Sequence, residues 1–151
     1  MTTISRNALL HYSAKQMFEL VNDVEAYPNF MDGCVATEVL YSDSGSMEAR
    51  LDLEKGGFAH SFTTVNVLTP FERIDLTLKD GPFDSFSGVW MFQALREDAC
   101  KISLDLEFSV RGGLLATAAG TLFDRVAGRL VDAVIARAAS IYPEGAATPR
   151  C

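Results

Sequence analysis

The side chains that could carry out chemistry in this 151-residue sequence are few. It has two histidines, His11 and His60, and neither has a histidine, cysteine or carboxylate nearby at metal-ligand spacing. The three cysteines, Cys34, Cys100 and Cys151, match no zinc motif and are interpreted as free thiols of a reducing compartment. No HExxH, GxSxG, P-loop or GxGxxG motif occurs. The sequence therefore predicts no metal site and no catalytic residue, and it favours a binding protein over an enzyme.

One predicted strand brings polar side chains to a face that should be buried. Phe62 and Leu68 are apolar and are expected to face the interior. Thr64 and Asn66 lie between them on the same face, because side chains alternate along a strand. Two interpretations stay open. In the first, Thr64 and Asn66 form hydrogen bonds with each other or with a buried water molecule. In the second, they line a cavity and bind a carbonyl or hydroxyl group of a ligand. His60, on the same face, is the one inward candidate for an acid–base group if the protein were an aromatase or cyclase.

An aromatic face follows later in the chain. Trp90 lies at even spacing from Phe86 and Phe92 in a predicted strand, so the three rings share one side. Core packing and the wall of a ligand cavity both explain such a face.

The net charge of −7 is distributed unevenly along the chain. Residues 1–110 carry a net charge of −9, whereas residues 111–151 carry +2. An acidic body argues against DNA binding, because non-specific nucleic-acid binding depends on basic surface. Arg125 and Arg129 are four residues apart in the basic part. They are either a solvated helix surface or a docking site for an acidic partner.

The elements that position these groups can be predicted from periodicity. Ser13 and Gln16 form a capping box, and the apolar residues that follow at helical spacing predict a helix as far as Val24. Pro28 predicts a second short helix over Pro28–Met31. A broad apolar stripe predicts one long helix from Gly113 to Tyr142. Alternating patterns between turn signals predict strands over 4–12, 35–41, 47–55, 58–68, 73–79, 84–94 and 101–110.

One polar face per strand predicts an antiparallel sheet with one side in water. A long helix after such strands is expected to lie in the concave face of the sheet and to leave a cavity there. The predicted fold class is α+β, with one domain over residues 1–142 and a flexible tail over 143–151. No stretch approaches the roughly 18 apolar residues of a membrane span, and no signal peptide is recognised. We expect a cytoplasmic protein that is not an integral membrane protein, and leave peripheral attachment to the inner membrane open.

Four segments together resemble a known family. Residues 21–34, 62–66, 80–83 and 88–92, in this order, are similar to the ribosome-association toxin (RatA) family. That family is close to the START-like coenzyme-Q-binding proteins and lies within the polyketide cyclase/dehydrase superfamily. The resemblance covers about Thr3 to Tyr142.

The resemblance implies a helix-grip (START/Bet v 1-like) fold, in which a curved sheet wraps around the C-terminal helix and encloses a hydrophobic tunnel. It implies a ubiquinone-like lipid as ligand, with a role in respiration and no required cofactor. For one branch it implies binding to the large ribosomal subunit and a block of subunit joining. It supplies no catalytic residue.

The predicted site follows from these interpretations. Thr64 and Asn66 are expected to meet the quinone oxygens, and Arg125 and Arg129 are the candidates for ribosome docking. The segment Tyr27, Pro28 and the loop Gly81, Pro82, Phe83 are expected to flank the cavity mouth. The apolar ligand-binding residues are expected to be Phe30, Phe62, Trp90, Phe92, Leu104, Leu106, Phe108, Phe123, Leu130 and Val134.

Overall fold

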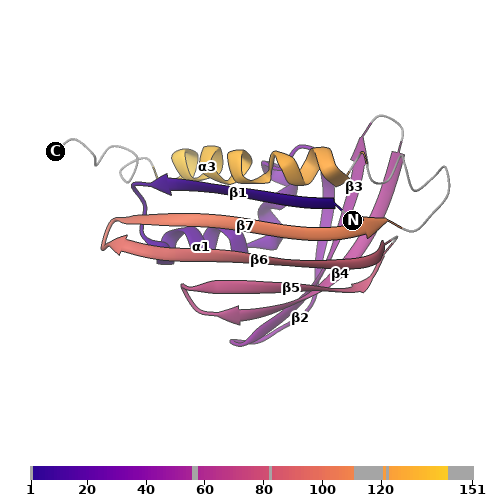
Figure 1. The fold of residues 1–151 in the computed structure, drawn as a ribbon, viewed down its shortest axis with the longest axis horizontal. Helices are drawn as coiled ribbons and strands as arrows, with labels where there is room; N and C mark the ends of the chain where they lie inside the picture. The colour runs from indigo at the N-terminus through magenta and orange to yellow at the C-terminus, as the bar shows by residue number, and fades with distance from the viewer. Residues whose placement is uncertain (1, 56–57, 82, 111–120, 122, 143–151) are drawn as a thin grey trace.

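The computed structural model describes residues 2–55, 58–81, 83–110, 121 and 123–142. The described strands are β1 (Thr2–Leu10), β2 (Cys34–Ser42), β3 (Ser46–Lys55), β4 (Phe58–Thr69), β5 (Arg73–Asp80), β6 (Phe83–Arg96) and β7 (Ala99–Val110). They form one antiparallel sheet in the order β1-β7-β6-β5-β4-β3-β2 (Figure 1). Each predicted strand is found, with ends shifted by a few residues at most.

The two faces of the sheet separate by residue type, as the alternation predicted. In β7, Ile102, Leu104, Leu106 and Phe108 are all buried, whereas Asp105 between them is exposed. Three ion pairs join charged side chains of the sheet, two within a single strand and one between β5 and β3. These pairs are Arg50–Asp52 at 3.0 Å, Arg73–Asp75 at 2.7 Å and Lys79–Glu48 at 2.8 Å.

Helix α1 (Ala14–Asn22) begins where the capping box predicted. The Gln16 backbone N–H donates to the Ser13 hydroxyl oxygen at 3.0 Å, and the Ser13 N–H donates to Gln16 Oε1 at 2.9 Å. These two bonds satisfy N–H groups that a helix start otherwise leaves free.

The second short helix lies earlier than predicted. It is the 3₁₀ helix η1 (Val24–Asn29), with Pro28 inside it, rather than a helix over Pro28–Met31. A 3₁₀ helix has three residues per turn and is short, so it leaves no apolar periodicity in a sequence. After η1 the chain continues in turns, where the Met31 N–H donates to the Tyr27 carbonyl at 2.8 Å.

The predicted C-terminal helix is interrupted. Residues 123–128 are helical, and α3 (Leu130–Ile141) follows after a non-helical Arg129 with φ −104° and ψ 0°. The Arg129 N–H donates to the Val126 carbonyl at 3.2 Å, a tighter turn than that of an α-helix. Gly128 precedes the break, and glycine weakens a helix because it has no side chain to restrict its backbone. Residues 113–120 and 122 of the predicted helix lie outside the described residues.

The sheet and the helices together enclose the core. In Figure 1, β2, β3 and β4 run across the direction of β1, β7 and β6, and α3 runs alongside β1. Gly88 in β6 permits a close approach within this sheet, because a Cβ atom there would collide with the Leu106 side chain. The predicted curved antiparallel sheet with a helix against its inner face is confirmed. Among the described helices, none is long and apolar enough to cross a membrane.

Candidate ligand-binding cavity

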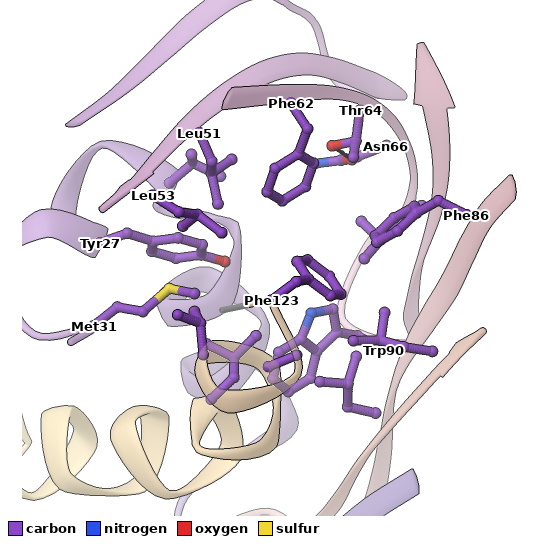
Figure 2. Close-up of a pocket in the computed structure, with 17 residues that line it drawn as sticks. Tyr27, Met31, Leu51, Leu53, Phe62, Thr64, Asn66, Phe86, Trp90 and Phe123 are labelled. Atoms are coloured by element: carbon purple, nitrogen blue, oxygen red, sulfur yellow. Dashed lines mark hydrogen bonds between the residues drawn. The ribbon is translucent and has the colours of Figure 1, made fainter. Parts of the chain in front are cut away.

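An internal cavity of about 70 Å³ lies between the inner face of the sheet, η1 and residues 123–130 of the C-terminal helical segment. Figure 2 shows side chains of the sheet pointing toward Tyr27 and Met31 across this space. The described residues that line it are Val24, Tyr27, Met31, Leu51, Leu53, Phe62, Thr64, Asn66, Leu76, Phe86, Trp90, Leu104, Leu106, Phe123, Val126, Ala127 and Leu130.

The polar groups of the cavity are concentrated on β4. Thr64 and Asn66 are buried, and the Thr64 hydroxyl donates a hydrogen bond to Asn66 Oδ1 at 2.8 Å (Figure 2). This bond uses the amide oxygen of Asn66, and no hydrogen bond of the described residues involves its NH₂ group. The cavity therefore has one polar end, and that end offers hydrogen-bond donors to a ligand oxygen.

Tyr27 is the single titratable side chain among the described lining residues. Its hydroxyl donates to the Val21 backbone carbonyl, so the phenol ring rather than the hydroxyl is available to the cavity. Burial, more than the nearby Cys34 and Asp23, raises the pKa of Tyr27 above its ordinary value. A neutral lining results, which suits an uncharged ligand because burial of an unpaired charge is unfavourable.

Phe123 occupies the centre of a cluster of phenylalanine rings beside the cavity. The cluster joins the first turn of residues 123–128 to three strands. The Phe123 ring centroid lies 4.6 Å from that of Phe108, 5.1 Å from Phe83, 5.5 Å from Phe62 and 5.6 Å from Phe86. Edge-to-face packing of this kind stabilises each ring pair by about 0.5–1.5 kcal/mol, so Phe123 is firmly placed.

The cavity is small for an aromatic ligand. A cavity of about 150 Å³ is known to hold one benzene molecule. The 70 Å³ observed here is about half of that, and a substituted quinone ring is larger than benzene. Lining side chains must therefore move for such a ligand to bind, and Met31 is the most adaptable of them because it has three rotatable bonds.

The structure brings most of the predicted ligand-binding residues to this cavity. Phe62, Thr64, Asn66, Trp90, Leu104, Leu106, Phe123 and Leu130 line it. The other four do not. Phe92 stacks on Trp90 with 6.1 Å between centroids and contacts Phe18 behind it. Phe108 supports Phe123, and Val134 is fully buried further along α3. Phe30 lies outside, where Arg137 covers its ring at 5.4 Å.

The residues of the predicted mouth are dispersed. Tyr27 lines the cavity itself, while Pro28 lies within η1. Phe83 belongs to the phenylalanine cluster and is buried. Gly81 lies against Phe62, and Pro82 is outside the described residues.

The remaining candidates lie at the surface or away from the cavity. His60 is half-buried on β4 and is absent from the described cavity lining. Arg125 and Arg129 are exposed. Cys34 and Cys100 are buried free thiols, and burial raises the pKa of each to about 11. The described residues contain no group of histidines, cysteines or carboxylates that could hold a metal ion.

Sequence reasoning missed several lining residues. Leu51 and Leu53 were identifiable, because they alternate with charged residues in β3. Val126 belonged to the predicted apolar stripe, and Ala127 was identifiable because it follows Phe123 by four residues. Met31 had no such signal, since it lies in a turn whose direction only the fold determines.

Comparison with known proteins gives a consistent result. Residues 10–135 match the family described as polyketide cyclase / dehydrase and lipid transport. The chain is 46% identical over 141 residues to the ribosome association toxin RatA of Pseudomonas aeruginosa, covering 93% of this chain and 98% of that protein. It is 26% identical over 142 residues to a mitochondrial coenzyme Q-binding protein COQ10 homologue of Xenopus laevis, covering 91% of this chain and 58% of that protein.

Solved structures share the architecture. The Zhui aromatase/cyclase from Streptomyces superposes with a TM-score of 0.81 at 18% identity, covering 95% of this chain and 98% of that one. At this identity the likeness shows the fold alone. The predicted helix-grip fold is therefore confirmed by both the sheet topology and its structural neighbours.

Proposed function

The chain belongs to the ribosome association toxin RatA family, within the polyketide cyclase / dehydrase and lipid transport family, and from this premise we propose that it binds an isoprenoid quinone such as ubiquinone without transforming it. The observation that carries the proposal is the Thr64–Asn66 pair, one polar end in an otherwise apolar cavity. The distant similarity to a coenzyme Q-binding protein supports the same ligand class.

The polar end fits a quinone carbonyl in particular. Thr64 donates its proton to Asn66 Oδ1, so the Asn66 NH₂ group is the donor that remains for a ligand. A quinone oxygen accepts hydrogen bonds and cannot donate them, which matches this polarity. A buried hydrogen bond of this kind contributes about 0.5–1.5 kcal/mol and mainly sets the orientation of the ring.

Affinity would come from the apolar part of the ligand. Trp90 on β6 and Leu104 on β7 present apolar surface on the sheet side of the cavity, and Leu130 does so on the helix side. Burial of apolar surface contributes about 25 cal/mol per Å², so a few isoprene units bind well without any charge pairing.

The proposal includes no catalytic step and no cofactor. Acid–base catalysis needs a group that can hold and release a proton near the operating pH. Tyr27 has a raised pKa and its proton is already donated to a backbone carbonyl. We further propose that the protein acts in the cytoplasm, exchanges quinone at the inner membrane and thereby supports respiration.

Two measurements test quinone binding. The native protein is extracted with solvent and the extract is analysed by mass spectrometry, where we expect an isoprenoid quinone in stoichiometric amount. The protein stripped of ligand is then titrated with a ubiquinone analogue that carries two isoprene units. We expect Asn66→Leu to weaken this binding by about two- to tenfold, the loss of one buried hydrogen bond, and the same substitution at the exposed Asn7 of β1 to leave it unchanged. Absence of quinone in the extract together with no binding of the analogue would reject the proposal.

Ribosome association is the second candidate function. It is favoured by 46% identity to a protein named as a ribosome association toxin, over nearly the whole of both chains. Arg125 and Arg129 are exposed on the helix side of the molecule. Neither has an ion pair with a described residue, unlike Arg50, Arg73 and Lys79 of the sheet. We propose that these two arginines face the large ribosomal subunit, where the acidic body would be directed away from RNA.

A further inference from the structure

A second hollow lies directly outside the cavity. It is a surface groove of about 350 Å³ between the turn that follows η1 and residues 126–133. Its described lining residues are Phe30, Met31, Asp32, Val126, Arg129, Asp132 and Ala133. Met31 and Val126 also line the internal cavity, so these two side chains form the partition between the two spaces.

One side of the partition is fixed and the other is adaptable. Gly33 has φ +93° and lies so close to the helix that a Cβ atom on it would come within 2.7 Å of Val126 Cγ2. The turn before it is held by the Cys34 N–H, which donates to the Met31 carbonyl at 3.0 Å. The backbone around Met31 is thus anchored against Val126. The Met31 side chain, by contrast, is a flexible thioether that can change rotamer without moving this backbone.

From this geometry we propose that a bound quinone reaches the cavity between Met31 and Val126, and that its isoprenoid tail lies in the outer groove. The proposal rests on the proposed quinone function and specifies where the tail lies. The internal cavity of 70 Å³ cannot hold a ring and a tail, and the groove shares two of its walls. Along the groove, Phe30 and Ala133 supply apolar surface, while the charged lining residues Asp32, Arg129 and Asp132 are exposed to solvent.

The test compares one charge at two positions of the same helix. Ala133→Glu places a carboxylate in the groove, whereas Ala136→Glu places it on the exposed face outside the groove lining. Each variant is titrated with two probes, a ubiquinone analogue with two isoprene units and the same quinone ring without a tail. Circular dichroism and denaturant unfolding report whether each variant is folded.

We expect Ala133→Glu to weaken binding of the tailed quinone at least tenfold and to leave the tail-less ring within twofold of the unchanged protein. Ala136→Glu should alter neither. If Ala133→Glu binds both probes normally, the tail takes another route, and this inference is wrong while quinone binding stands. If the unchanged protein binds neither probe, both proposals fall.

A second variant covers the case in which Ala133→Glu does not fold. Val126→Ala shortens one of the two side chains of the partition and so widens the proposed passage. We therefore expect the tailed quinone to associate and dissociate at least fivefold faster in stopped-flow measurements. Unchanged rates in folded Val126→Ala would place the passage elsewhere in the molecule.

Discussion

Gly33 and Val126 are in such close contact that there is no room for a side chain at position 33. A Cβ atom on Gly33 would lie 2.7 Å from Val126 Cγ2, and the positive φ of +93° is itself unfavourable for any other residue. The contact joins the turn after η1 to the helical residues before α3, two segments that are far apart in the sequence. It therefore fixes one wall of the proposed passage.

The first prediction concerns this contact. Gly33→Ala should lower the free energy of unfolding by about 2 kcal/mol or more, because it adds backbone strain to a steric clash. The matched control is Gly45→Ala, where φ is not positive and the nearest atom to a new Cβ is Asp43 Oδ1 at 3.8 Å. The control should change stability by less than about 0.5 kcal/mol in urea unfolding. Equal stability of the two variants would contradict the described geometry.

The second prediction concerns the buried polar pair. Thr64→Val removes the donor to Asn66 Oδ1 and leaves that oxygen buried without its partner, which should destabilise the fold by about 1–3 kcal/mol. The double variant Thr64→Val/Asn66→Leu should be less destabilised than the sum of the two single changes, because both partners are then apolar. Simple additivity in denaturant unfolding would show that the two side chains are not coupled.

The third prediction uses the single tryptophan of the chain, Trp90, which lines the cavity. A quinone in this cavity should quench the Trp90 fluorescence, with saturation at one equivalent of ligand. Free tryptophan in the same titration should show only a gradual collisional decrease. Trp90→Ala should weaken quinone binding in a protein that remains folded, although it should also lower stability by about 3–5 kcal/mol. Unchanged quinone affinity in folded Trp90→Ala would exclude this part of the cavity as the site.

The fourth prediction concerns pH. Burial raises the pKa of Cys34 and Cys100 to about 11, from an ordinary value of 9.0. The folded state therefore holds these protons more tightly than the unfolded state, so stability should be retained below pH 9 and fall as the pH rises from 9 towards 11. Urea unfolding measured across this interval should show the loss, and Cys34→Ala/Cys100→Ala should reduce its slope. An unchanged slope would mean that other groups, such as Tyr27, cause the pH dependence.

The fifth prediction tests ribosome association. Overexpression of the unchanged protein should shift the ribosome sedimentation profile from joined ribosomes to free subunits, and Arg125→Ala/Arg129→Ala should abolish the shift. The control variant Arg96→Ala/Lys101→Ala removes the same charge from exposed positions on β6 and β7 and should retain it. Loss of the effect in both variants would indicate a requirement for overall charge rather than for the helix surface.

Much of the fold could be predicted from the sequence, because local patterns determine local structure. The alternation of Ile102, Leu104 and Leu106 with polar residues marked β7, and the Ser13–Gln16 capping box marked the start of α1. The same alternation placed Thr64 and Asn66 on a buried face. Which of them donates to the other, and that the Asn66 NH₂ group remains available, depended on side-chain geometry that no spacing contains.

The sequence by itself determined the strands, the buried faces and the family, since strand periodicity and motif order are properties of the chain. Tertiary structure decided what each apolar residue does within the interior. Phe123 and Phe108 have equal hydrophobicity, yet Phe123 lines the cavity and Phe108 supports it from behind. Met31 and Val126 form a partition because the curved sheet brings the turn after η1 against the C-terminal helix. Hydrophobic burial is non-directional, so a sequence indicates which residues leave water but not which of them come to lie beside an empty space.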